Sequence, residues 1–216
     1  MPAAAGTANR TLSRMRILGI DPGLGITGYA VVESHSFRET RVVEAGAIRP
    51  GRGSDLPSRL HALHEDLSSI IAEFTPARIA VEQVFVHRRH VRSAVQMGHA
   101  RGVILLAAAA AKLEFDEFSP AEIKKSLTGH GQASKHQMQS AVMQACGLSA
   151  LPEPADVADA IAIAFCGATR LHLPLGPRLV GADAVASRDG APRRRTSRED
   201  ALATLRLRGV TVPEGS

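Results

Sequence analysis

The first fifty residues alternate short β-like apolar runs with tight turns before any helical pattern begins. The run RILGID, residues 16–21, is followed at once by a Pro-Gly turn and then by a second apolar run at residues 25–33. Two β-prone runs joined by so short a turn predict an antiparallel hairpin, and residues 41–48 can add a third strand. An antiparallel meander at the start of the chain limits the folds that the remaining residues can complete.

A helical pattern follows the meander. From Leu56 to Phe74 apolar residues recur at spacings of three and four, which is one face of an amphipathic helix, and Thr75 and Pro76 end it. The short apolar run at residues 78–81 then predicts a strand beside the first one. A strand, a helix and a strand in sequence usually close a right-handed parallel crossover, so the sheet is expected to be mixed.

The later elements complete an α/β domain. A helix over residues 91–112 carries Gly98 and Gly102, whose spacing would allow close packing against another element, and a fifth strand is expected at residues 115–119. Further helices are predicted over residues 120–127, 134–146 and 154–168. The expected fold is therefore a mixed five-stranded sheet, an antiparallel meander plus parallel strands, flanked by helices.

The chain ends differ in composition from this domain. Residues 1–14 lack an apolar segment and are expected to be a disordered extension, while residues 171–216 are rich in Arg, Pro, Gly and Ser and predict a basic, flexible tail. A short helix at residues 200–207 is possible. One folded domain, residues 15–170, remains.

Composition excludes several classes of protein. No apolar run approaches a membrane span, and no secretory signal is evident, so a cytoplasmic protein with no membrane partner is expected. Cys146 and Cys166 lie far apart without the spacing of zinc ligands, which favours reduced thiols.

The distribution of charge favours a polyanionic partner. The net charge is +5, and no Asp or Glu occurs over residues 83–113 or 123–152. The first of these blocks holds Arg88 and Arg89, and the second holds Lys124, Lys125 and Lys135. Two acid-free basic blocks thus lie between the acidic residues considered next.

Asp21 and Glu82 each end a β-like apolar run. Asp21 precedes the Pro-Gly turn, and Glu82 is the only acid between Glu73 and Glu114. An Asp in that position can simply cap a turn. If the two strands are parallel neighbours, however, both carboxylates project toward one point, and partly buried charges of like sign are costly unless a metal binds them.

Asp156 and Asp159 are three residues apart on the last predicted helix, which places both on one face. Asp156 by itself could stabilise the start of the helix through a favourable interaction with the helix dipole. Asp159, directly before the apolar run AIAIAFC, is harder to explain by a structural role. If this helix packs over the sheet edge, four carboxylates converge. Hard oxygen ligands of this kind suit Mg²⁺, two per site, with Mn²⁺ as a substitute, and predict metal-dependent phosphoryl chemistry.

Five segments resemble, in order and in spacing, the successive motifs of the RuvC family of Holliday junction resolvases. They are GIDPGLGITGYAVVE, VEQVF, MGHARGV, the block at residues 120–131 and ADVADAIAIA, and they span about residues 15–169. The resemblance implies an RNase H-like nuclease domain over residues 15–170 and a homodimer. It also implies an endonuclease that nicks four-way DNA junctions symmetrically in recombination and repair, leaving 5′-phosphate ends. A branch-migration helicase complex of RuvA and RuvB is the partner it implies.

The resemblance also assigns roles to residues. Asp21, Glu82, Asp156 and Asp159 match the catalytic positions of the family, Phe85 matches an aromatic that stacks on bases, and Lys124 and Lys135 match residues that face phosphate. Lys125, Arg88 and Arg89 are expected to add DNA contacts. Two positions depart from the pattern, His99 where a glutamine is common and Glu122 where a basic residue is frequent.

Three other functions compete with a junction nuclease. An actin-like kinase or chaperone shares the Gly-Ile-Asp-x-Gly start but needs a second domain, for which 216 residues leave no room. A non-catalytic junction-binding module predicts loss of at least one acid, and none is lost. A related RNase H-like nuclease in RNA processing is the nearest alternative.

Overall fold

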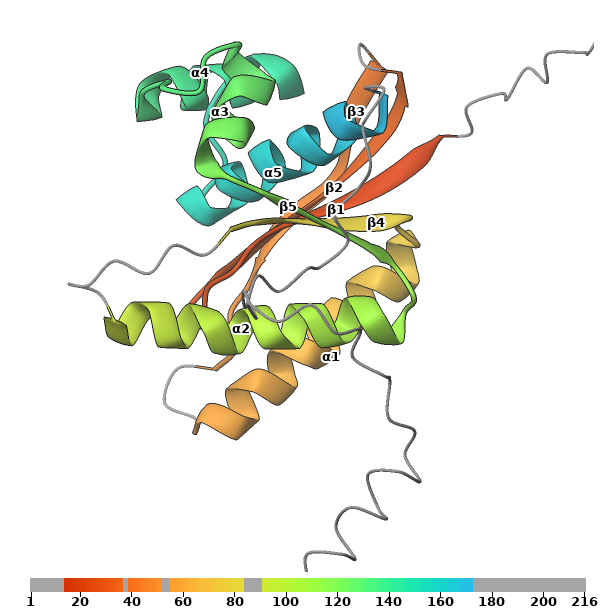
Figure 1. Ribbon diagram of the computed structural model, residues 1–216, viewed down its shortest axis with the longest axis vertical. Helices are drawn as coiled ribbons and strands as arrows, with labels where there is room; N and C mark the ends of the chain where they lie inside the picture. The colour runs from red at the N-terminus through yellow and green to blue at the C-terminus, as the bar shows by residue number, and fades with distance from the viewer. Residues whose placement is uncertain (1–13, 37–38, 52–54, 84–90, 173–216) are drawn as a thin grey trace, which may run out of the picture. The chain divides into compact units, whose positions relative to one another are not determined.

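The computed structural model describes residues 14–36, 39–51, 55–83 and 91–172, which form helices on both faces of one sheet (Figure 1). The strands lie in the order β3-β2-β1-β4-β5. They are β1 (Met15–Asp21), β2 (Thr27–Ser36), β3 (Glu39–Ile48), β4 (Arg78–Glu82) and β5 (Glu114–Phe118). β1, β2 and β3 pair antiparallel, whereas β4 is parallel to both β1 and β5. The predicted mixed five-stranded sheet is confirmed.

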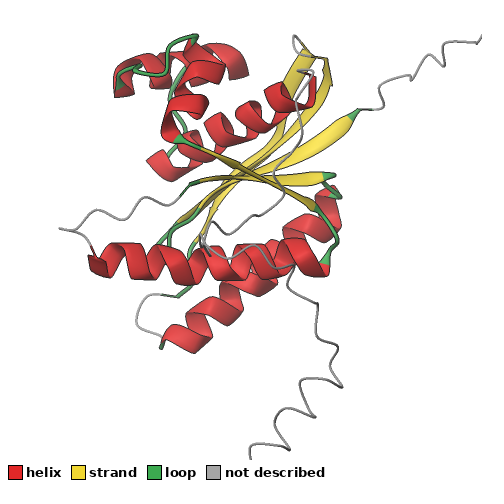
Figure 2. Cartoon of the chain, viewed as in Figure 1, coloured by secondary structure: helices red, strands yellow, loops and turns green. Residues whose placement is uncertain are grey.

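The helices divide between the two faces of the sheet, as Figure 2 shows in red against yellow strands. They are α1 (Leu56–Phe74), α2 (Val91–Ala110), α3 (Pro120–Thr128), α4 (Lys135–Cys146) and α5 (Ala155–His172). α1 and α2 cover one face, here named the α1–α2 face. α5 lies on the other, the α5 face, with α3 and α4 beside it (Figure 1).

Local sequence explains where the helices begin. The Asp55 side chain caps α1 by accepting a 2.8 Å hydrogen bond from the backbone of Ser58. Ser119 and Ser134 form capping boxes with the residues three positions later at the starts of α3 and α4. Ser134, predicted as the first residue of α4, is thus its cap.

α5 is longer than its predicted end at residue 168. It continues to His172, whose Nε2 lies 2.8 Å from the Ser34 hydroxyl, and Leu171 packs against the core. α5 therefore continues two residues past residue 170, the predicted end of the domain. The terminal extension and tail otherwise lie outside the described residues.

Gly98 and Gly102 differ from expectation. A β-carbon built at either position would meet nothing within 4 Å, so within the described part of the chain neither glycine packs closely against another element. α2 contacts α1 and β5 through its other side, where Ala100, Ile104 and Ala107 are buried. In the described residues no helix has both the length and the apolar character needed to cross a membrane.

Candidate active site

Asp21 and Glu82 end neighbouring parallel strands. Asp21 is the last residue of β1 and Glu82 the last of β4, and the register pairs the residues just before them, Ile20 and Val81. Side chains alternate between faces along a strand, so both carboxylates lie on the α5 face, opposite the buried Ile20 and Val81. The predicted convergence of these two acids at one sheet edge is confirmed.

Two strand glycines bring α5 onto this edge. Gly28 pairs with Asp21 across β1 and β2, and a β-carbon on Gly28 would lie 2.0 Å from the backbone oxygen of Asp156. A β-carbon on Gly19 would likewise lie 2.4 Å from the backbone nitrogen of Ala164. Because these positions carry no side chain, the helix backbone rests directly on the strands. The first turns of α5 are thereby held beside Asp21.

The sequence reasoning missed this role of Gly19 and Gly28. A glycine inside a strand often marks a close backbone approach, and that signal could have found both. Its consequence is the placement of Asp156 and Asp159 over the strand ends, one in the first turn of α5 and the other a turn later. Asp156 is half-buried, whereas Asp159 is more exposed.

The four carboxylates influence one another electrostatically. Partial burial, followed by the charges of Asp159, Asp156 and Glu82, raises the pKa of Asp21 to about 7. Burial and then Asp159 also raise the pKa of Glu82. Such shifts show that the protein alone does not balance the negative charge gathered here.

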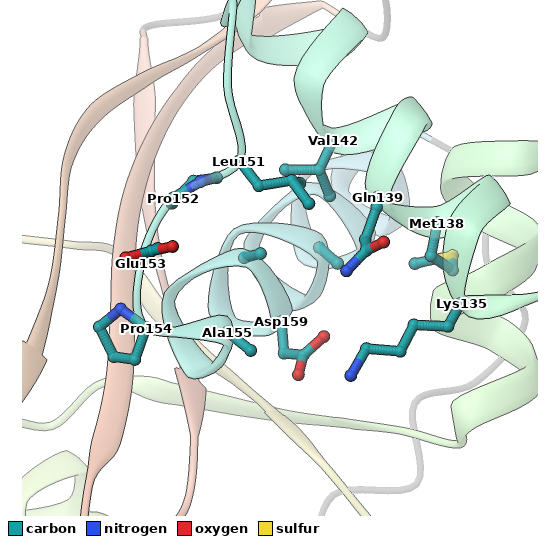
Figure 3. Close-up of a pocket in the computed structure, with 12 residues that line it drawn as sticks. Lys135, Met138, Gln139, Val142, Leu151, Pro152, Glu153, Pro154, Ala155 and Asp159 are labelled. Carbon is teal, nitrogen blue, oxygen red and sulfur yellow. The ribbon is translucent and has the colours of Figure 1, made fainter.

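Two lysines from the second basic block border the acids. Lys124 of α3 opposes the rise in the pKa of Glu82, and Lys135, the first residue of α4, opposes the rise in the pKa of Asp159 that burial causes. Figure 3 shows Lys135 and Asp159 pointing toward each other from α4 and α5. These two lysines therefore offset part of the negative charge of the cluster.

The contacts of Glu122 account for its departure from the family pattern. Its carboxylate accepts a 2.8 Å hydrogen bond from the Ser119 backbone at the start of α3 and forms a 3.2 Å ion pair with Arg170 of α5. The Arg170 guanidinium also stacks 4.1 Å from the centre of the Phe118 ring. Glu122 therefore fixes α3, and with it Lys124, to α5 and β5.

The chemistry of the acid cluster fits a divalent cation. All its donors are carboxylate oxygens, and the raised pKa of Asp21 means that a bound cation would relieve an existing cost. Among the described residues, however, no three acidic, histidine or cysteine side chains converge closely enough to enclose one ion. Binding of one ion by three of these carboxylates therefore requires their side chains to rotate toward one another.

Other predicted residues are only partly placed. Phe85, Arg88 and Arg89 lie outside the described residues. Lys125 is exposed on α3, and its DNA contact stays a prediction; His99, which departs from the family pattern, is exposed on α2.

A protein-family model described as crossover junction endodeoxyribonuclease RuvC matches residues 17–167. This chain belongs to the RuvC family.

Individual relatives agree with this membership. The RuvC of Rhodopirellula baltica is 46% identical over 163 residues, which cover 76% of this chain and 91% of that protein. The RuvC of Heliobacterium modesticaldum is 43% identical over 157 residues, covering 73% of this chain and 96% of that protein. Among solved structures, Thermus thermophilus RuvC in complex with Holliday junction substrate has a TM-score of 0.68 and 30% identity, covering 73% of this chain and 94% of that one.

Membership in the RuvC family settles the class of the enzyme. The chain has the RNase H-like fold and the activity of a crossover junction endodeoxyribonuclease, a Holliday junction resolvase acting in recombination and repair. Nucleases of the family are metal-dependent. The actin-like kinase, the RNA-processing nuclease and the non-catalytic module are not favoured.

Proposed function

We propose that Asp21, Glu82, Asp156 and Asp159 form the catalytic centre at which this RuvC-family chain cuts four-way junction DNA. The observation that carries the proposal is the close contact of α5 with Gly28, which gathers Asp156 and Asp159 near Asp21. Burial first, and the charges of the other three acids second, raise the pKa of Asp21 to about 7. Structural roles such as turn capping do not require that gathering. The charge is concentrated where a metal-dependent nuclease needs it.

The four carboxylates would hold two Mg²⁺ ions, with Mn²⁺ as a substitute. When bound, the ions lower the pKa of the attacking water and stabilise charge on the phosphate and on the leaving oxygen. Asp21 is the acid whose pKa all three of the others raise, so it would contribute to holding the ions together with each of them. Water adds to phosphorus and the bond to the 3′ oxygen breaks, leaving a 5′-phosphate and a 3′-hydroxyl.

Basic side chains around the acids would hold the DNA. Lys124 and Lys135 are near enough to the acids to alter their pKa values, so either can contact the scissile phosphate or its neighbour. Lys125, Arg88 and Arg89 would bind more distant phosphates, and Phe85 would stack on a base near the junction centre. Binding that depends on such contacts should weaken steeply with salt.

An apolar stripe on α2 supports a homodimer. Val95 and Leu106 are 54% and 59% exposed, and they share one side of the helix with Gly98 and Gly102. Large exposed apolar side chains next to open glycines suit close approach of a second α2. Leu106→Asp should shift the protein toward a monomer in sedimentation velocity. A dimer that persists in this variant would show that the interface does not lie on this side of α2.

The remaining partners follow from the family. A branch-migration helicase complex of RuvA and RuvB would deliver the junction, and the cytoplasm, where bacterial DNA lies, would be the site of action. The Thermus thermophilus relative was solved with a Holliday junction, which supports a four-way junction as the ligand here.

The test is a comparison of labelled substrates. The purified chain is incubated with a four-way junction, a linear duplex and an RNA/DNA hybrid, each with Mg²⁺, with Mn²⁺ and with a chelator. Paired nicks confined to the junction and dependent on the metal are expected. Cleavage of the hybrid in preference to the junction would contradict the proposal.

A further inference from the structure

A cavity of about 310 Å³ lies between α4, α5 and the segment that leads into α5 (Figure 3). This volume is at the lower end of the range for ligand sites, about 300–1,000 Å³, and roughly ten times the share of one water molecule, about 30 Å³. Its size suits one nucleobase. Leu151 and Pro152 close one end of it.

The cavity exists because two helical faces of unequal bulk oppose each other. α4 contributes Lys135, Met138, Gln139 and Val142, which share one face at spacings of three and four. The matching face of α5 consists of Ala155, Ala158, Asp159 and Ala162. Three of these four side chains are single methyl groups, so α5 leaves unfilled the space that α4 faces.

The mouth of the cavity belongs to the candidate active site. Asp159 is one of the four acids, and Lys135 offsets part of its charge. Figure 3 shows both side chains at one end of the cavity, with Gln139 directed toward the same space from α4. A phosphate held beside Asp159 and Lys135 therefore places a neighbouring nucleotide at the opening.

We propose that this cavity receives the base of a nucleotide flanking the scissile phosphate, so that the chain reads that base at the cleavage step. The inference rests on the proposed function of the acid cluster. The walls supplied by Met138, Val142 and Leu151 are apolar and suit the faces of a base. Bases near a junction are less firmly stacked than those in a continuous duplex, which lowers the cost of removing one from the stack.

Two polar groups among these walls can distinguish bases. The Gln139 amide offers both a donor and an acceptor, whereas the Glu153 carboxylate accepts only. Such groups discriminate between the edges of bases, and each good pair changes the preference by about fivefold or more. Gln139 is the stronger determinant, because it is half-buried whereas Glu153 is exposed.

The first experiment measures base preference at cleavage. Junctions that differ only in the base on either side of the scissile phosphate are cut by the wild type under single-turnover conditions. The ratio of the fastest to the slowest rate is expected to fall about fivefold or more in Gln139→Ala. Gln144→Ala, the same change on α4 outside the cavity, should keep the wild-type ratio.

A second experiment detects the base without cleavage. The fluorescent base 2-aminopurine is placed beside the scissile phosphate, and the junction is bound by the Asp21→Asn variant. Fluorescence should rise, because the base leaves its stack for a cavity whose lining contains no aromatic side chain. Adding Ala155→Leu, which fills the mouth, should abolish the rise while leaving the dissociation constant within about twofold.

The outcomes separate the two proposals. A wild type that cuts every junction at one rate, or a fluorescence rise that survives Ala155→Leu, would overturn the base pocket while leaving the nuclease intact. A Gln139→Ala variant with the wild-type ratio would do the same. A wild type that cuts no junction with either metal would instead contradict the proposed function of the acid cluster.

Discussion

The two faces of the sheet are built from side chains of different size. On the α1–α2 face the core consists largely of Leu and Ile, among them Leu18, Leu63, Leu67 and Ile104, all fully buried. On the α5 face, Gly19, Gly28 and a run of alanines let the helix backbone touch the strands. Bulky side chains keep α1 and α2 farther from the sheet, whereas small side chains allow α5 to pack directly against it.

This difference separates stability from chemistry. Burial of large apolar side chains supplies most of the folding free energy, about 25 cal/mol for each Å². Close backbone contact contributes less apolar area but fixes the position of α5, and therefore of Asp156 and Asp159, against the strand that carries Asp21. Substitutions on the α1–α2 face should lower stability and leave the cleavage rate nearly unchanged. Substitutions on the α5 face should lower the cleavage rate.

The largest expected effect is that of Asp21→Asn on the α5 face. The change removes the central charge of the acid cluster without touching the basic surface. Cleavage of a four-way junction should fall by about 10³-fold or more, with junction affinity retained. Single-turnover assays measure the cleavage rate, and a gel-shift titration measures the junction affinity. Metal-dependent nicking at the wild-type rate would show that Asp21 is not part of the catalytic centre.

Gly28→Ala should have the next largest effect. The new β-carbon would lie 2.0 Å from the backbone oxygen of Asp156, so α5 must move away from the strand by about 1 Å or more. Displacement on this scale can cost about 10²-fold in cleavage.

Gly25→Ala is the matched control, because a β-carbon there meets nothing within 4 Å. Cleavage and circular dichroism distinguish misplacement from unfolding. Equal rates for the two variants would show that the close seat of α5 does not govern the chemistry.

The pH dependence of cation binding should show a smaller effect. The pKa of Asp21 in the cation-free protein is raised to about 7, so below that pH a cation must displace a proton from it. The apparent affinity for Mn²⁺ should therefore rise up to about tenfold per pH unit below pH 7 and level off above it.

Calorimetric titrations with Mn²⁺ at even pH intervals from about 5.5 to about 8.5, a range that brackets the pKa of Asp21, measure this dependence of affinity on pH. Asp156→Asn removes one repelling charge and should move the plateau to lower pH. A flat profile in the wild type would mean that Asp21 does not contribute to binding.

Leu67→Ala should have the smallest effect on cleavage. Leu67 is fully buried on the α1–α2 face, and its truncation should lower the free energy of unfolding by about 2–5 kcal/mol. Cleavage per folded molecule should stay within about twofold of the wild type. Urea denaturation measures the free energy of unfolding, and single-turnover assays measure cleavage. A tenfold lower cleavage rate per folded molecule would show that the α1–α2 face also positions the site.

Much of the fold was predictable from local signals. The spacing of apolar residues in α1 and the Pro-Gly turn after Asp21 predicted those elements nearly to the residue. Glu122 carried a readable signal as well, since a serine followed three residues later by a glutamate is a capping box. Buried charge was not predictable, because Arg78 and Asp116, paired at 2.6 Å, meet only when β4 and β5 align.

By itself the sequence determined the order of strands and helices, the four carboxylates and the basic blocks around them, because these depend on residue type and spacing along the chain. Only the tertiary structure decided that Gly19 and Gly28 would bring α5 against β1, that Lys124 and Lys135 would offset part of the acid charge, and that alanines on α5 would leave a cavity beside Asp159. Each of these depends on atoms from segments far apart in the chain. Contacts of that kind are set by packing, which local patterns do not encode.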